Sequence, residues 1–163
     1  MINSSGTLVC LFTLWLGLRP GEFCNVRKSD IDFTRQVMIL RDTKSGGDQP
    51  VPIPDELLDL LHQATVGLQP DDYVFVHSKG GPIRRPQVEK RIRRWCNARG
   101  VQDVTPQTIR RSLALLLENH GALEIQVQSL LRHKGSSTNR RHYAKINLDA
   151  ARAALKHHPA RDC

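Results

Sequence analysis

The N-terminal quarter of the chain contains one long apolar segment and two short apolar runs. Residues 5–16 (SGTLVCLFTLWL) are apolar on most sides, which predicts a buried helix that ends at Gly17. A second helical turn is expected to begin at Pro20, because proline is tolerated at the first position of a helix. Residues 30–42 carry two apolar runs on either side of residues 34–36, a pattern typical of two strands joined by a turn.

A third strand is predicted at residues 49–54 (QPVPIP), where Val51 and Ile53 alternate with polar or proline positions. Proline donates no hydrogen bond to a sheet, so these prolines confine the strand to a sheet edge. Residues 43–48 (TKSGGD) are small, polar or glycine, as expected of the turn that joins this strand to the one before it.

Apolar residues at helical spacing dominate the rest of the chain. Helices are predicted over residues 55–64, over 87–99, from Thr105-Pro106 to Gly121, over roughly 122–132, around Tyr143 as a short basic helix, and over 148–157. The side chains predicted to face inward are Leu57, Leu58, Leu60, Leu61, Val88, Ile92, Trp95, Cys96, Ile109, Leu113, Leu116, Leu117, Ile125, Val127, Leu130 and Leu131. The fold is therefore predicted to be mostly α with one small antiparallel β-sheet (α+β).

Length and charge narrow the classes of function. The 163 residues fit one domain of ordinary size. Lys and Arg number 24 against 16 Asp and Glu, a net charge of +8, and much of the excess falls within residues 84–99 and 132–145. A localised basic face is typical of proteins that bind a polyanion, most often nucleic acid. The most apolar stretch, residues 8–18, is too short to span a bilayer, so no membrane role is expected.

The cysteines and the absence of familiar cofactor motifs narrow the chemistry further. Cys10, Cys24, Cys96 and Cys163 have neither CxxC nor Cys/His ligand spacing, so no disulfide framework is predicted and a reducing cytoplasm is expected. The chain has no P-loop and no HExxH motif. We therefore expect no metal and no cofactor; the family resemblance described below implies in addition that there is no small-molecule substrate.

Two segments place a guanidinium group where it can hold a phosphate. Arg19 follows the predicted helix end and precedes Glu22 by three residues; a fixed guanidinium fork binds phosphate bidentately, although a surface ion pair fits the same segment. Gln107 and Arg110 share a face in the first turn of a predicted helix, where free backbone N–H groups attract an anion. A solvated surface charge is the alternative interpretation of Arg110.

Five segments, in order and spacing, resemble the tyrosine recombinase (phage integrase) family. They are LGLRPGEF with SDIDF after it (16–33), TKSGGDQPVPIP (43–54), QTIRRS (107–112), LLRH (130–133) and KGSSTNRRHYAKI (134–146). Each segment is weakly specific alone, but their common order covers about residues 5–150. The resemblance implies a site-specific recombinase or integrase that breaks and rejoins DNA without metal or ATP.

The resemblance also implies a role for each matching residue. Arg19 and Arg110 would bind the scissile phosphate, and Lys44, on the hairpin turn, would protonate the departing 5′ oxygen. His133 would orient the phosphate, and Tyr143 would attack phosphorus to give a 3′-phosphotyrosyl enzyme. The implied partner is double-stranded DNA, on which the family assembles as a homo-oligomer, a tetramer, and the implied location is the cytoplasm, in association with the nucleoid.

Two positions depart from the family pattern. Gln107 stands where the family usually has a proton-transferring histidine, a kind of group that contributes about 10²–10⁴-fold to a rate. Arg132 replaces a glycine that ends a helix in the left-handed conformation, so Gly135 is expected to end that helix instead. Two alternatives therefore stay open: a catalytically impaired DNA-binding relative, and a topoisomerase IB-like enzyme that only nicks and reseals. A protein-interaction module unrelated to DNA is a third.

The domain organisation follows from the same resemblance. Residues 1–163 are expected to form a single catalytic domain without the family's N-terminal DNA-binding domain, either as an excised domain or as a short form. Residues 147–163 resemble the family's C-terminal helix, and they are expected to dock on a neighbouring protomer.

Overall fold

The computed structural model describes residues 4–41, 47–132 and 140–161, with backbone alone for residues 4–6 and 140–147. Its elements, with η for short 3-10 helices, are α1 (Ser4–Leu16), η1 (Pro20–Phe23), η2 (Lys28–Asp30), β1 (Ile31–Asp32), β2 (Val37–Leu40), β3 (Gln49–Pro52), α2 (Asp55–Thr65), α3 (Arg85–Asn97), α4 (Pro106–Asn119), α5 (Glu124–Leu130), α6 (Arg140–Leu155) and η3 (Pro159–Arg161). The predicted fold class, mostly α with a small antiparallel sheet, is confirmed. In the described ranges no helix is both long and apolar enough to cross a membrane.

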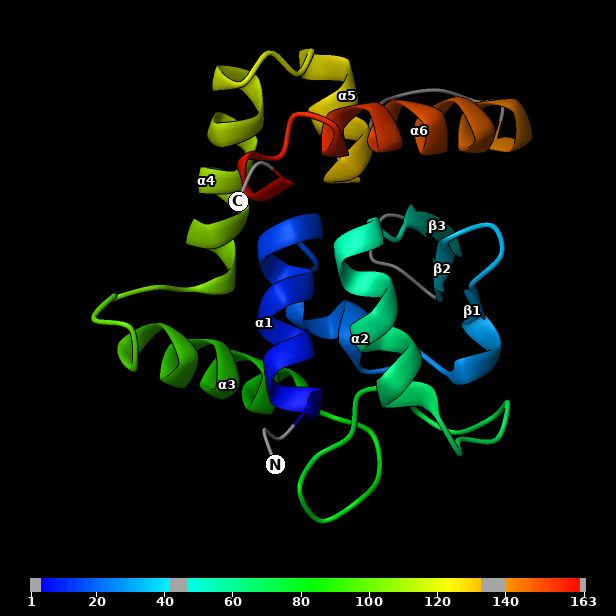
Figure 1. The fold of residues 1–163 in the computed structure, drawn as a ribbon, viewed down its shortest axis with the longest axis vertical. Helices are drawn as coiled ribbons and strands as arrows, with labels where there is room; N and C mark the ends of the chain where they lie inside the picture. Colours follow the sequence, from blue (N-terminus) through cyan, green and yellow to red (C-terminus); the bar gives the residue numbers. More distant parts are fainter. Residues whose placement is uncertain (1–3, 42–46, 133–139, 162–163) are drawn as a thin grey trace.

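The first helix forms the centre of the molecule. α1 packs against α2, α3 and α4, while the sheet lies beyond α2 and the α5–α6 pair crosses one end (Figure 1). The helix is buried around most of its circumference, with Val9, Phe12 and Leu16 at 0% exposure. Even its polar Thr13 is buried, and the Thr13 hydroxyl donates to the carbonyl of Val9 at 2.7 Å. The predicted buried helix with its end at Gly17 is confirmed.

The three strands form one antiparallel sheet in the order β1-β2-β3, with Met38 opposite Val51. β3, with its two prolines, lies at an edge of the sheet, as predicted. Residue Gln36, in the tight turn between β1 and β2, has a φ of +55°. α6 packs against β3, so the C-terminal helix contacts the sheet of its own chain.

The predicted inward faces of three helices were too wide. Leu60 of α2, Leu116 of α4 and Ile125 of α5 are 38%, 43% and 62% exposed. In α2 and α4 the buried side chains form a narrow stripe at i,i+4 spacing: Leu57 with Leu61, and Leu113 with Leu117. Residues beside each stripe, such as Leu58 and Ile109, pack on the core only in part. Leu60, Leu116 and Ile125 face solvent, so their prediction as core residues is wrong.

Two predicted helix boundaries were also wrong. The short helix around Tyr143 and the helix at 148–157 are one continuous helix, α6, because no glycine or proline interrupts residues 140–155. α5 ends at Leu130, and Arg132 adopts the left-handed conformation with a φ of +54°. Gly135, which was expected to end this helix, lies outside the described residues, and the helix ends before it.

Gly17→Ala should destabilise the protein by about 2–4 kcal/mol, because alanine disfavours the left-handed φ of +56° and overpacks the core. An added Cβ would lie 2.7 Å from Leu131 Cδ2 and 3.3 Å from Arg110 Cγ. Urea unfolding measures the change. The control is Gly21→Ala, whose Cβ meets nothing within 4 Å and which should change stability by less than about 0.5 kcal/mol. Equal stabilities for the two variants would contradict this account of Gly17.

Candidate functional site

The first part of the site forms where α1 ends and η1 begins. Arg19 is the N-cap residue of η1, and its backbone N–H donates to Glu22 Oε2 at 2.7 Å. The Arg19 guanidinium also donates to Glu22 Oε1, at 3.0 Å. The ion pair considered in the sequence is therefore present, but it is not a simple surface pair: the Glu22 side chain is 7% exposed and that of Arg19 is 36% exposed.

The second part of the site is the N-terminal end of α4. Thr105 caps this helix as predicted: its hydroxyl accepts from the Thr108 N–H at 3.1 Å, and the Thr108 hydroxyl accepts from the Thr105 N–H at 2.8 Å. The cap fixes the direction of the helix, so that Gln107, which is exposed, and Arg110, which is buried, line the same cleft.

Arg110 is a buried cation that is incompletely hydrogen-bonded. Its Nη1 donates to the carbonyl of Gly17, whereas its buried Nη2 has no hydrogen-bond partner among the described residues. Burial and, after it, the charges of Arg132 and Arg19 together lower the pKa of Arg110 to about 9, although the charge of Glu22 opposes them. The group remains a cation at neutral pH, in surroundings that supply too little negative charge. An anion in the cleft would relieve both deficits.

The sequence interpretation missed how Arg132 completes this cluster. The Arg132 side chain is 4% exposed and pairs with Glu22 Oε2 at 2.9 Å. Burial would by itself raise the pKa of Glu22, but the charge of Arg132 and hydrogen bonds from Arg19 and Arg132 outweigh it, so that pKa lies below its usual range. Arg132 had been interpreted only as a poor fit for a left-handed position. A signal was present in the sequence: a long donor side chain at a helix end can bind the carbonyls left free there.

Arg19, Glu22, Gln107 and Arg110 line a cleft of about 1140 Å³ between η1, α3 and α4, and Arg132 lies outside this lining. The charged residues of its lining are Arg19, Arg41, Arg85, Arg93, Arg110, Arg111, Glu22 and Glu89. Arginines outnumber glutamates in this lining, so the cleft suits an anionic ligand.

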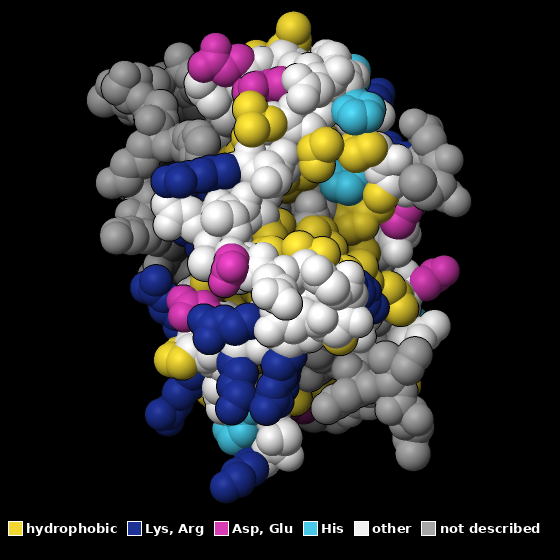
Figure 2. All heavy atoms as spheres, turned by 90° about the vertical axis from the view of Figure 1, so that its left-hand side faces the viewer, with side chains coloured by type: hydrophobic (Ala, Val, Ile, Leu, Met, Phe, Trp, Pro, Cys, Tyr) yellow, Lys and Arg dark blue, Asp and Glu magenta, His cyan; other side chains and the backbone are white. Residues whose placement is uncertain are grey.

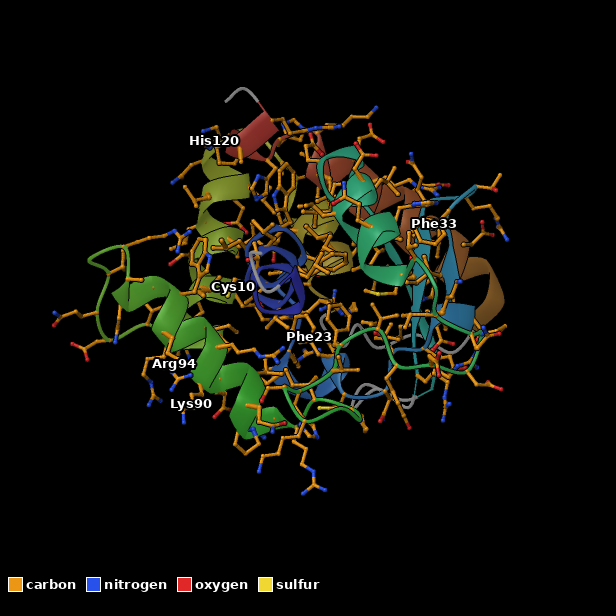
Figure 3. All side chains as sticks on the ribbon, turned by 60° about the horizontal axis from the view of Figure 1, so that its bottom comes forward. Cys10, Phe23, Phe33, Lys90, Arg94 and His120 are labelled. Carbon is orange, nitrogen blue, oxygen red and sulfur yellow. The ribbon has the colours of Figure 1, made fainter. Side chains whose placement is uncertain are left out.

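The predicted basic region of residues 84–99 is the exposed face of α3. Lys and Arg side chains gather on the lower half of the side of the molecule that Figure 2 presents. Lys90 and Arg94 point away from the body of the molecule, on the exposed side of the helix (Figure 3). The cleft therefore opens beside a surface that is itself basic.

The structure places half of the predicted site residues. Arg19, Gln107 and Arg110 line one cleft. Lys44 and His133 lie outside the described residues, and Tyr143 belongs to α6, where the backbone alone is described. The catalytic roles of all six residues stay predictions. In the parts of the chain that the structure describes, no cluster of three or more His, Cys, Asp or Glu side chains could hold a metal ion.

Comparison with known proteins matches residues 4–149 to the model of the phage integrase family. The chain belongs to the phage integrase family. The tyrosine recombinase XerA of Thermococcus onnurineus is 30% identical over 152 residues, which are 90% of this chain and 53% of the relative. The chain thus spans about half the length of this curated member of the family.

Solved structures share the fold. An integrase from mycobacterium phage Brujita has a TM-score of 0.70 at 18% identity, covering 97% of this chain and 58% of the integrase. The Tn1549 transposon integrase in complex with transposon right end DNA has a TM-score of 0.65 at 17% identity, covering 96% of this chain and 59% of the other. At these identities the likeness establishes the integrase fold alone.

Glu22→Gln should lower the free energy of unfolding at pH 7 by about 3–5 kcal/mol, because it leaves the buried Arg132 without its counter-ion. The lowered pKa of Glu22 means that the carboxylate stabilises the fold above the usual carboxyl range and loses this effect as the pH falls through its own pKa. The stability difference between wild type and variant should therefore shrink in acid, as measured by urea unfolding across pH.

The control for this prediction is Glu89→Gln, which removes the half-buried partner of the exposed Arg85. Exposed pairs contribute little, so this change should cost less than about 1 kcal/mol. A Glu22→Gln cost that is equally small, or that does not vary with pH, would contradict the assignment of a stabilising buried pair.

Proposed function

We propose that the chain is the catalytic part of a site-specific DNA recombinase, which cleaves and rejoins double-stranded DNA through a 3′-phosphotyrosyl intermediate without metal or ATP. The observation that carries the proposal is the buried Arg110 Nη2, which has no partner among the described residues, in an arginine-lined cleft. Membership of the phage integrase family and the fold shared with a DNA-bound transposon integrase support it.

The cleft is suited to a phosphodiester. A phosphodiester carries one negative charge, and nucleophilic attack on phosphorus adds a second. Arg19 and Arg110, held at the end of α1, supply cationic donors for those oxygens. Each such fixed donor contributes on the order of 3–4 kcal/mol to the transition state, by analogy with single oxyanion-hole donors. The exposed cations of α3 extend this field along a DNA backbone, so binding should weaken steeply with salt.

The proposed reaction exchanges one phosphoester for another. The Tyr143 hydroxyl releases its proton to water, and its oxygen forms a bond to phosphorus while the bond from phosphorus to the 5′ oxygen breaks. Lys44 gives the departing 5′ oxygen a proton. The unperturbed pKa of tyrosine is about 10, so attack needs the positive field of the arginines to favour the phenolate. The 5′-hydroxyl of another strand then reverses the step, and the energy of the cleaved bond is kept in the tyrosyl ester.

A catalytically impaired DNA-binding relative is the second candidate. Gln107 favours it, because the residue that replaces the family's histidine lines the same cleft as Arg110. Glutamine can hydrogen-bond a phosphate, but it exchanges no proton near neutral pH. A topoisomerase IB-like enzyme uses the same residues and differs only in resealing the original strand.

The proposal also includes assembly of several protomers on DNA. The homo-oligomer and the exchange of residues 147–163 between protomers stay predictions, as does the nucleoid location. In the single chain the C-terminal segment packs on its own domain: His158 stacks on Trp15 at 3.9 Å, and Arg161 pairs with Glu56 at 2.8 Å. If residues 147–163 are exchanged between protomers, these contacts within one chain are replaced by the same contacts made to the neighbouring protomer.

The wild-type protein should form a covalent adduct with a nicked suicide DNA substrate, and Tyr143→Phe should abolish it, because phenylalanine lacks the nucleophilic oxygen. The protein is incubated with the DNA at low salt, and the readout is a protein–DNA band on a gel that survives denaturation. The chain offers a matched control in its other tyrosine: Tyr73, which stacks under Arg27, should tolerate Tyr73→Phe without loss of the adduct. DNA binding by wild type without any adduct would favour the impaired relative.

Gln107→His should raise the rate of adduct formation, within the range of about 10²–10⁴-fold that a positioned acid–base group contributes. Single-turnover kinetics across pH 5–8 should show the new dependence of an imidazole. Gln102→His, at an exposed position outside the cleft lining, serves as the control and should leave the rate unchanged. A Gln107→His variant as slow as wild type would mean that this departure from the family does not limit the reaction.

A further inference from the structure

Arg132 is the residue by which this chain departs from the glycine of its family, and it lies at the centre of the arginine cluster. Its guanidinium makes five hydrogen bonds: Nε to Glu22 Oε1 at 3.4 Å, Nη2 to Glu22 Oε2 at 2.9 Å and to the Gly17 carbonyl at 3.3 Å, and Nη1 to the carbonyls of Leu130 at 2.7 Å and Leu16 at 3.4 Å. A guanidinium has five N–H donors, so all of them are used. A group that is 4% exposed and fully bonded is part of the fold and does not reach for the ligand itself.

These bonds connect Arg132 to both arginines of the proposed phosphate site. Glu22 accepts hydrogen bonds from Arg132 and from Arg19, so the carboxylate bridges the two guanidiniums. The carbonyl of Gly17 accepts from Arg132 Nη2 and also from Arg110 Nη1. The buried Arg132 side chain therefore binds both the Glu22 carboxylate, which pairs with Arg19, and the Gly17 carbonyl, which accepts from Arg110.

The charges of the cluster give Arg132 a second effect. Glu22 is the carboxylate that pairs with Arg19, and its charge also acts on Arg110. Because Arg132 pairs with this carboxylate, the carboxylate's charge is already matched before a phosphate arrives. Without Arg132 the same carboxylate would compete with the phosphate for the guanidiniums of Arg19 and Arg110.

The position of Arg132 explains why an arginine is tolerated with a φ of +54°. A left-handed conformation is unfavourable for a non-glycine residue because its Cβ approaches a backbone carbonyl oxygen too closely. In return the guanidinium binds carbonyls at the C-terminal ends of two helices: Leu16, the last residue of α1, with Gly17 after it, and Leu130, the last residue of α5. Cations at helix C-terminal ends are favourable, so the same bonds that hold the site also offset the strain.

We propose that Arg132 is a positioning residue of this enzyme: it fixes Glu22 and the Gly17 carbonyl, so that Arg19 and Arg110 face the DNA phosphate with the carboxylate already neutralised. This inference rests on the proposed function, since it names a supporting residue of the same site. The alternative is that Arg132 only stabilises the fold. The affinity of folded Arg132 variants for phosphate distinguishes a positioning role from this purely structural role.

The first measurement uses inorganic phosphate and needs no turnover. Its affinity is obtained from the Nε–H NMR signals of Arg19 and Arg110 in wild type, Arg132→Gly and Arg132→Lys, with Arg99→Lys as the control for an exposed arginine that stacks on Trp95. Arg132→Gly should weaken phosphate binding about 10- to 100-fold, because a small displacement of supporting groups has effects of this size. Arg132→Lys should lose about tenfold, because lysine keeps the charge but not the fork. Arg99→Lys should match wild type.

The second measurement separates positioning from DNA affinity. The maximal rate of adduct formation at saturating suicide DNA should fall by the same factors in the Arg132 variants, while the Kd for DNA changes less than about threefold because the α3 cations remain. Circular dichroism identifies the variants that fold. If Arg132→Gly does not fold, Arg132→Lys decides the matter alone.

The outcomes distinguish this inference from the proposed function. Folded Arg132 variants that bind phosphate within about twofold of wild type overturn the positioning role. If they bind phosphate as wild type does and wild type still forms the adduct, the recombinase assignment stands without it. If wild type binds phosphate, the variants lose it and no adduct forms, the positioning role stands and the catalytic assignment fails.

Discussion

The carbonyl oxygen of Gly17 accepts hydrogen bonds from two buried guanidiniums, and the rest of the site depends on this junction. Gly17 has a φ of +56°, and this left-handed conformation ends α1 and directs the chain into η1, which Arg19 caps and which contains Glu22. Because Gly17 has no Cβ, Arg110 and Leu131 approach its backbone closely. The ends of α1 and α5 and the start of α4 thus meet at one residue, and each brings a cation to it.

The cost of this arrangement is buried positive charge. Arg19, Arg110 and Arg132 share one carboxylate, Glu22, and burial together with the charges of Arg132 and Arg19 lowers the pKa of Arg110 to about 9. A site built in this way is less stable empty than occupied, because an anion that binds only the folded state stabilises it. Binding sites commonly trade stability for function in this way. The basic face of α3 adds charges that stay hydrated, so they carry no desolvation cost, and they favour encounter with a polyanion.

Local rules predicted the parts of the structure that local forces decide. The buried α1 with its end at Gly17, the edge position of β3 with its prolines, and the Thr105 cap of α4 all follow from neighbouring residues. Leu60 and Leu116 were assigned wrongly because periodicity gives the direction of a helix face but not its width, which depends on what packs there. The division of α6 into two helices was wrong because a change in composition was taken for a boundary where no helix breaker occurs.

The distant partners of Arg132 could not be predicted from the sequence, although a bond from its side chain to a nearby helix-end carbonyl could. An arginine in a left-handed position is unfavourable on local grounds, and its partners Glu22, Leu16 and Gly17 precede it by more than a hundred residues. In contrast, Gln107 and Arg110 were placed on one face from their spacing alone, and they line one cleft.

We infer that the arginine cluster is an anion site, because the buried Arg110 Nη2 has no hydrogen-bond partner among the residues that the structure describes. A crystal structure of the protein soaked in orthovanadate, a phosphate mimic, tests it most directly. The account predicts the anion within hydrogen-bonding distance of Arg110 Nη2 and of the Arg19 guanidinium, with the Arg132–Glu22 pair intact beneath them. Vanadate bound only at the exposed cations of α3, with Arg110 Nη2 still without a partner, would contradict it.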